Sequence, residues 1–147
     1  EMGVSAFVPL ICGRSVPQER GTRPAARYAR WEKIVTEAAE QSRRGRLPRL
    51  HAPLPFLQAV QEAQGRCLIP WESERAIGLH DVLEEAKCLS TVSVFIGPEG
   101  GFTGKEVEQA RAAGVVPVSL GRRILRAETA GVVAVAAIMY HLGELGT

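Results

Sequence analysis

The sequence has little of the chemistry that marks membrane, disulfide-bonded or metal-binding proteins. No stretch reaches the ~18 apolar residues of a membrane span and the chain does not open like a signal peptide, so we expect a cytoplasmic protein without a membrane anchor. Its three cysteines form no CxxC pair, which favours buried, reduced thiols over a reactive nucleophile. Its three histidines lack metal-ligand spacing, so we expect no metal.

The common phosphate-binding and hydrolytic motifs are also absent. A P-loop ending at Gly104-Lys105 would need glycine at position 99 and serine or threonine at 106, and both positions are glutamate. The glycines near position 100 do not follow the GxGxxG order of dinucleotide-binding folds. No Ser/His/Asp or paired-carboxylate spacing indicates hydrolysis. The glycines therefore suit either close approach of a ligand to the backbone or a purely structural turn.

What the sequence does contain indicates one α/β domain. Its 147 residues, 46% of them hydrophobic, suit a single folded unit with its own core, where we also place the aromatic residues of the 49–71 region. Strands with no polar alternation, each followed by a helix, predict a parallel sheet with helices on both faces. The expected strands are 5–11, 49–51, 66–71, 91–96 and 115–120, and the expected helices are 24–42, 53–64, 79–87, 105–113 and 127–142.

Two glycine-containing loops lie where predicted strands end. The first, 97–101, has the sequence GPEGG, and the second, 120–126, leads into the last predicted helix. Ligands of open α/β sheets bind in the crevice at the carboxyl ends of the strands. We therefore expect the two loops to form one pocket.

The net charge of +2 is distributed unevenly. The first 50 residues hold ten Lys and Arg against five Asp and Glu, whereas residues 51–147 hold eight against eleven. A strongly basic first third is typical of a surface that meets phosphates, and a merely solvated surface is the alternative. The arginines of this region are Arg14, Arg20, Arg23, Arg27, Arg30, Arg43, Arg44, Arg46 and Arg49.

The last predicted helix is apolar on nearly every side between Val132 and Met139. Such a helix is buried all round, either inside the domain or against another subunit. Because it is too short to cross a membrane, the pattern predicts a homodimer interface.

Several motifs together follow the order of a known family. They are VPL at 8–10, RS at 14–15, RWEKI at 30–34, EAAEQS at 37–42, FIGPEGGF at 95–102, KEV at 105–107, LG at 120–121 and ILRAETA at 124–130. With these motifs the chain resembles the RsmE family of the SPOUT superfamily along nearly its whole length. Members of that family are bacterial methyltransferases that modify N3 of a uridine in 16S ribosomal RNA.

The resemblance implies a SPOUT-type α/β fold with a C-terminal trefoil knot and S-adenosylmethionine as the cofactor. Family members also carry an N-terminal PUA-like RNA-binding domain, which we expect to be absent from residues 1–147, leaving the methyltransferase domain. A knotted module that binds cofactor or RNA without turnover, or that only dimerises, is the alternative. The implied cofactor-binding residues are Ile96, Gly97, Pro98, Glu99, Gly100, Gly101, Leu120, Gly121, Ile124, Leu125 and Arg126.

Methylation at N3 of uridine also gives Arg126 and nearby acidic residues a possible part in the reaction. The nitrogen becomes nucleophilic when its proton is lost or shared, and a nearby cation favours the anion. We expect Arg126 to stabilise that anion or to grip the nucleotide, and Glu128 or Glu99 to orient Arg126 or accept a proton. Capping of the last helix is the favoured alternative for Glu128. The residues expected to contact small-subunit ribosomal RNA are Arg14, Arg23, Arg27 and Arg30.

Overall fold

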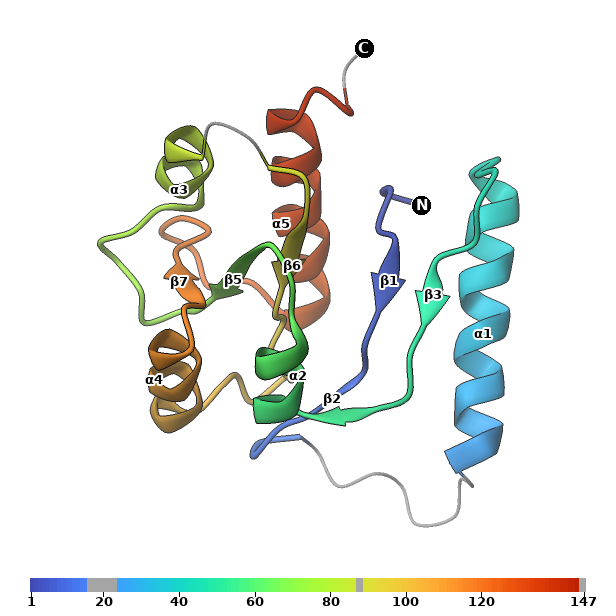
Figure 1. Cartoon of the computed structure of the whole chain (residues 1–147), viewed down its shortest axis with the longest axis horizontal. Helices are drawn as coiled ribbons and strands as arrows, with labels where there is room; N and C mark the ends of the chain where they lie inside the picture. Colours follow the sequence, from blue (N-terminus) through green and yellow to red (C-terminus); the bar gives the residue numbers. More distant parts are fainter. Residues whose placement is uncertain (16–23, 87–88, 146–147) are drawn as a thin grey trace.

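The computed structural model describes residues 1–15, 24–86 and 89–145 (Figure 1). All five predicted helices are present, with ends that differ from the expected ones by a few residues. The elements in chain order are β1 (Ala6–Phe7), β2 (Leu10–Ile11), α1 (Pro24–Gln41), β3 (Arg49–Leu50), β4 (Leu54–Pro55), α2 (Phe56–Glu62), β5 (Arg66–Pro70), α3 (Leu79–Glu85), β6 (Val92–Val94), α4 (Gly104–Ala112), β7 (Val116–Val118) and α5 (Ala127–His141).

Prolines account for the two places where the predicted elements are wrong. The single strand expected over 5–11 is divided into β1 and β2, because Pro9 has no N–H for a ladder and restricts the residue before it. The helix expected from Pro53 begins only at Phe56, since Pro55 is extended (ψ 141°) and belongs to β4. Each short strand keeps a parallel partner: β1 pairs with β3, and β2 pairs with β4.

The main sheet has the strand order β6-β5-β7, and both of its strand pairs are parallel. The expectation of parallel strands is confirmed, but the strands form three hydrogen-bonded groups instead of one continuous sheet. Pro117 is accommodated in β7 because that strand is at the edge of its group, where a missing N–H costs little.

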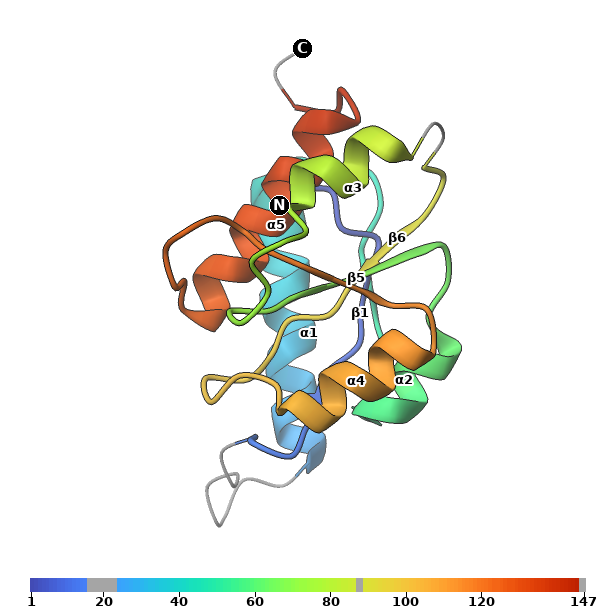
Figure 2. The ribbon, with the colours of Figure 1, turned by 90° about the vertical axis from the view of Figure 1, so that its left-hand side faces the viewer.

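Helices cover both faces of the main sheet, as predicted (Figure 2). Consecutive residues of the central strand β5 point to opposite faces, so Leu68 and Ile69, both fully buried, belong to different core clusters. Ile69 packs in a cluster with residues of α2 and α4, whereas Leu68 packs with residues of α3 and α5.

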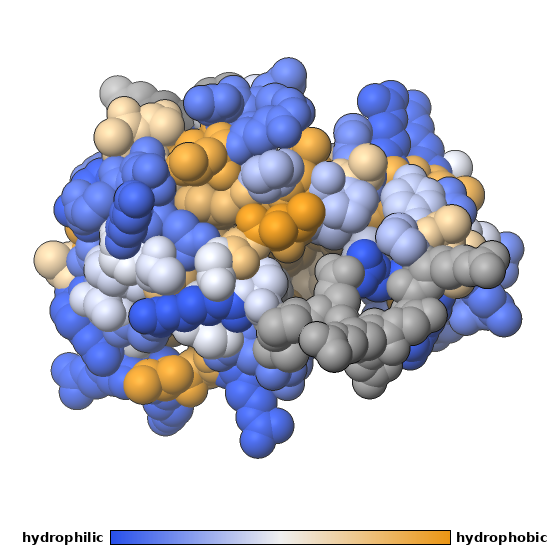
Figure 3. Space-filling model, turned by 90° about the horizontal axis from the view of Figure 1, so that it is seen from below, coloured by the Kyte–Doolittle hydropathy of each residue, from blue (hydrophilic) through white to orange (hydrophobic). Residues whose placement is uncertain are grey.

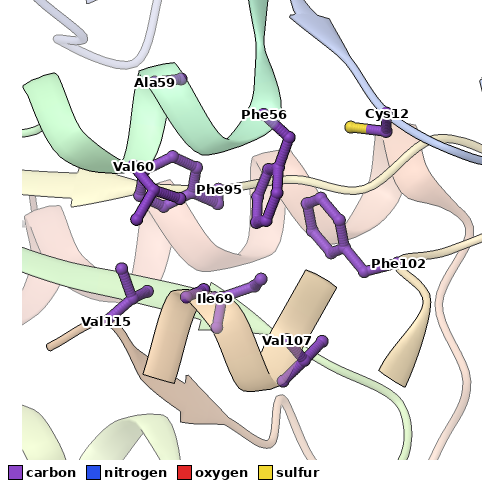
Figure 4. Packing of buried hydrophobic residues seen from close by; sticks show 10 residues of the cluster. Cys12, Phe56, Ala59, Val60, Ile69, Phe95, Phe102, Val107 and Val115 are labelled. Carbon is purple, nitrogen blue, oxygen red and sulfur yellow. The ribbon is translucent and has the colours of Figure 1, made fainter. Parts of the chain in front are cut away.

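Three phenylalanines join the first cluster to the loop that follows β6 (Figure 4). The ring of Phe56 lies edge-on to Phe95 at 5.8 Å and tilted against Phe102 at 4.9 Å. Aromatic pairs in these arrangements add to the stabilisation that comes from burial alone. The segment between Phe95 and Phe102, which contains the first glycine loop, is therefore anchored in the core at both ends.

Two helices carry apolar side chains that this chain leaves exposed. In α5, Ala134 and Ile138 are buried, but Val132 and Tyr140 are 58% and 73% exposed. Burial of this helix on all sides within the domain is therefore wrong. In α1, Ile34 is half-exposed although it lies on the predicted apolar stripe.

Apolar side chains also reach the surface at the lower end of the molecule. The view from below shows an apolar area surrounded by hydrophilic residues (Figure 3). The elements near this end in Figure 1 include β2 and α2, whose most exposed apolar residues are Ile11 and Leu57.

Candidate cofactor and RNA-binding site

The carboxyl ends of the three parallel strands of the main sheet open onto one cavity of about 370 Å³. Its volume lies in the ordinary range of small-molecule sites. The two glycine loops line this cavity together, as the sequence predicts. The lining residues are Pro70, Trp71, Glu72, Arg75, Ile96, Gly97, Pro98, Glu99, Gly100, Gly101, Phe102, Ser119, Leu120, Gly121, Arg123, Ile124, Leu125, Arg126, Ala127 and Ala130.

Two glycines of this wall have backbone conformations that other residues rarely adopt. Gly101 has φ +68°, and a Cβ built on it would lie 3.0 Å from Oε1 of Glu72. Gly121 has φ +112°, and a Cβ built there would meet nothing within 4 Å. Open space above the backbone at Gly121 means that a ligand can approach the main chain directly.

A third segment, 70–75, also lines the cavity and has no motif that would have predicted it. Trp71 is only partly buried: it packs against the core cluster, and it also faces the cavity, so its assignment to the core alone is incomplete. The backbone fixes this segment to β7, since Trp71 donates to the carbonyl of Val118 and Leu79 donates to that of Ser119, both at 3.0 Å.

A buried carboxylate holds the same loop in shape. Glu74 is 9% exposed and accepts hydrogen bonds from the N–H groups of Ala76 (2.8 Å) and Ile77 (3.2 Å). Those hydrogen bonds, foremost the one from Ala76, lower the pKa of Glu74 despite its burial, and Arg111 of α4 lies 3.7 Å away. Glu74 thus carries its charge inside the loop and keeps Trp71, Glu72 and Arg75 at the cavity.

Charged residues of both signs line the cavity. Arg75, Arg123 and Arg126 are the cations, and Glu72 and Glu99 are the anions. All five are exposed or half-exposed residues, so their charges remain available to a ligand. A lining of mixed charge suits a ligand that itself carries both positive and negative groups.

Arg126 and Glu128, which are both predicted to take part in the reaction, have different positions. Arg126 is the N-cap residue of α5, lines the cavity and makes no side-chain capping bond. Glu128 lies in the first turn of α5 and is exposed, outside the lining of the cavity. Its position suits a favourable interaction with the helix dipole, which is the alternative expected for it.

The arginines predicted to contact RNA are not equivalent in the structure. Arg14 is exposed and donates from Nη1 to the carbonyl of Gly100 at 3.1 Å, which places it at the edge of the cavity. Arg30 is exposed on α1, and the guanidinium of Arg27 lies 5.3 Å from the centre of the Trp31 ring. Arg23 lies outside the described residues. Among the other basic residues, Arg44 has a structural role, since it donates to the carbonyl of Val4.

Two cysteines of the described chain have thiols that resist ionisation. Burial, reinforced by the charge of Glu106, raises the pKa of Cys12 to about 11, and burial also raises the pKa of Cys67. Both remain protonated at neutral pH and are poor nucleophiles. Within residues 1–15, 24–86 and 89–145, no group of His, Cys, Asp and Glu side chains is arranged to hold a metal ion. None of the helices described for this chain has the length and apolar character needed to span a bilayer.

The fold and the cavity define an α/β domain with a small-molecule site at the carboxyl edge of its parallel sheet. Residues 1–139 match the family described as RNA methyltransferase domain, and the chain belongs to that family.

Relatives in this family include two proteins named ribosomal RNA small subunit methyltransferase E. The Synechocystis protein is 41% identical over 144 residues, covering 94% of this chain and 45% of that protein. The Bacillus subtilis protein is 36% identical over 147 residues, covering 96% of this chain and 57% of that protein. The chain therefore spans about half the length of the curated relatives it matches.

A solved structure agrees with this assignment. Ribosomal RNA small subunit methyltransferase E from Neisseria gonorrhoeae, crystallised with S-adenosylmethionine, matches with a TM-score of 0.83 and 37% identity. The match covers 95% of this chain and 56% of that one. At this level of similarity the SPOUT-type methyltransferase fold extends over nearly the whole of the chain.

Proposed function

We propose that residues 1–147 form a methyltransferase domain that binds S-adenosylmethionine and methylates N3 of a uridine in 16S ribosomal RNA in the cytoplasm. The observation that carries this proposal is the single cavity lined by both glycine loops, whose motifs are those of the RsmE family. The names of the relatives and the cofactor bound in the Neisseria protein support the same cofactor and substrate here.

The residues of the cavity fit this cofactor in shape and charge. The backbone of 96–101 and 120–126 would hold its adenosine and methionine parts, and the open space at Gly121 leaves the main-chain groups within reach. The amino-acid part of the cofactor carries a carboxylate and an ammonium, which suit Arg75 and Glu72 in the third wall. When bound there, S-adenosylmethionine supplies an electrophilic methyl group on a positively charged sulfur.

We infer that Arg126, which lines the cavity at the start of α5, acts on the uridine. Its guanidinium would lower the energy of the N3 anion, and the positive end of the α5 dipole would add to the same effect. The target base would first leave its stack, which a single-stranded or looped RNA allows easily. Arg14 at the edge of the cavity and Arg27 and Arg30 on α1 would contact the RNA backbone, and we propose the same for Arg23, which lies outside the described residues.

We infer a C-terminal trefoil knot from the resemblance to the SPOUT fold. Both ends of the 71–79 loop are hydrogen bonded to Val118 and Ser119, so this loop and the end of β7 form one closed unit beside the cavity. We infer that the segment after β7 passes through this unit before α5 begins. True knots are rare, and here the knot would hold 120–126 against 97–101.

Methyl transfer from labelled cofactor to small-subunit ribosomal RNA tests the proposed function. We expect this chain to bind S-adenosylmethionine in a calorimetric titration, and the methylated product to be N3-methyluridine. Cofactor binding with no transfer to any RNA would favour the alternative of a binding module. Absence of cofactor binding would contradict the methyltransferase and favour a module that only dimerises.

The exposed side of α5 supports a homodimer. Val132, Ala136 and Tyr140 follow one another at four-residue spacing, and Val133 precedes Ala136 by three residues, so the four side chains lie on one side of the helix. Val132, Val133 and Tyr140 are at least 38% exposed. We expect Val132→Asp to convert a dimer into a monomer in light scattering without loss of helical content, because Val132 is exposed in the single chain. Ile34→Asp in α1 places the same charge on another exposed apolar position and should leave the dimer intact. A monomeric mass for the unmodified chain would contradict the homodimer.

A further inference from the structure

The carboxylate of Glu106 is hydrogen bonded by two segments that are far apart in the sequence. One oxygen accepts from the backbone N–H of Gly13 at 2.8 Å. The other accepts from the N–H of Thr103 at 2.8 Å and lies 2.9 Å from its hydroxyl. The Thr103 hydroxyl in turn accepts from the N–H of Glu106, which completes a capping box at the start of α4.

The bond to Gly13 is not needed for the capping box, and it fixes the residue beside Arg14. Ser15 and Cys12 close the same turn, since the N–H of Cys12 donates to Oγ of Ser15 at 3.0 Å and the N–H of Ser15 donates to the carbonyl of Cys12 at 3.1 Å. Cys12 is buried in the core cluster. The turn 12–15 is therefore tied to the core on one side and to α4 on the other.

This turn lies directly against the first glycine loop. Nη1 of Arg14 donates to the carbonyl of Gly100, and a Cβ built on Gly100 would lie 3.1 Å from the Cβ of Arg14. The absence of a side chain at Gly100 thus makes room for Arg14. One of the five N–H donors of its guanidinium is used in this way, and the side chain remains exposed.

Glu106 is ionised at neutral pH, as this arrangement requires. Partial burial alone would raise its pKa, but the hydrogen bonds from Gly13 and Thr103 and the charge of Arg14 together hold the pKa below its usual value. Arg14 and Glu106 thus favour each other electrostatically although their side chains form no direct ion pair.

We propose that Glu106 is a positioning residue for the RNA substrate: it holds the 12–15 turn on the glycine loop so that Arg14 presents its free donors to an RNA phosphate at the edge of the cavity. This inference rests on the proposed function, since it assigns a substrate contact of that same site. It predicts that Glu106 affects the affinity for RNA through Arg14, separately from its effect on the stability of α4.

A capping residue elsewhere in the chain shows which substitution separates the effect on RNA affinity from the effect on the stability of α4. In α3, Asp81 occupies the position equivalent to Glu106 and accepts from the N–H of the N-cap residue Gly78 at 3.1 Å. An aspartate at 106 should therefore still cap α4, but its shorter side chain would not reach Gly13 as well. Thr103→Ala has the opposite effect, because it removes the capping hydroxyl and leaves Gly13 bonded to Glu106.

We expect Glu106→Asp to raise the KM for RNA about tenfold, the effect of losing one hydrogen-bonded charged contact, with kcat and cofactor affinity unchanged. Thr103→Ala should lower the melting temperature and leave the KM for RNA as it was. Glu108→Asp, an exposed change in the same helix, should alter neither. Amide exchange provides a reading independent of activity: Gly13 should lose protection in Glu106→Asp and keep it in Thr103→Ala.

A KM for RNA that does not change in Glu106→Asp, or a Gly13 amide that stays protected, would overturn the positioning role. Failure of the unmodified protein to methylate any RNA would instead contradict the proposed function. In that case fluorescence anisotropy with a labelled RNA decides the role of Glu106, since equal affinities of Glu106→Asp and the unmodified protein would reject it.

Discussion

Replacing Arg126 by lysine should slow methyl transfer on the order of a hundredfold while leaving most of the affinity for S-adenosylmethionine, as is typical when a group that stabilises developing charge is removed. Lysine keeps the positive charge but not the planar guanidinium with its fixed donors, so the uridine anion or the nucleotide would no longer be held in one orientation. The backbone at 126 would still start α5 and line the cavity.

Single-turnover methylation and calorimetric titration, made on the same preparation, measure the two quantities separately. Arg122→Lys provides the matched control, because Arg122 is an exposed residue of the same loop that does not line the cavity. Arg126 would have no part in the reaction if both variants methylated RNA at the rate of the unmodified protein.

Replacing Gly121 by valine should weaken cofactor binding by at least about a hundredfold. The branched side chain would occupy the open space above the backbone, where we place the cofactor, and φ +112° would strain any residue other than glycine. Calorimetric titration with S-adenosylmethionine measures the loss directly, and circular dichroism shows whether the fold is kept.

A second glycine with positive φ provides a control for the backbone strain that valine would cause at position 121. Gly114 has φ +88° with nothing within 4 Å of a built Cβ, and it follows α4 away from the cavity. Gly114→Val should therefore lower stability without lowering cofactor affinity. Equal affinity of the Gly121 variant and the unmodified chain would remove the second glycine loop from the cofactor site.

The sequence predicts where the site lies and two of the segments that line it, but not the third segment. Both glycine loops could be placed at one edge of the sheet, because buried strands followed by helices leave little choice of topology. The segment containing Trp71, Glu72 and Arg75 could not, since it is an irregular loop whose shape depends on Glu74 and on bonds to β7. Neither feature leaves a periodic signal in the sequence.

The same difference between local and tertiary information explains the remaining errors. The break at Pro9 could have been predicted from the chemistry of proline, but the apolar run over residues 5–11 favoured one continuous strand. For α5, an apolar composition predicts burial without indicating which surface provides it. The exposure of Val132 and Tyr140 shows that the other described residues of this chain do not cover this side of α5.

The way the cavity is assembled has a consequence for how the protein folds. Its walls come from residues 70–75, 96–102 and 119–130, and β5 joins β7 through pairs such as Leu68 with Val116, 48 positions along the chain. Chains whose native contacts connect distant residues fold slowly, because long loops must close before those contacts stabilise anything. The cofactor site should therefore be among the last parts of the domain to form, and refolding chains should regain ligand affinity only in their slowest kinetic phase.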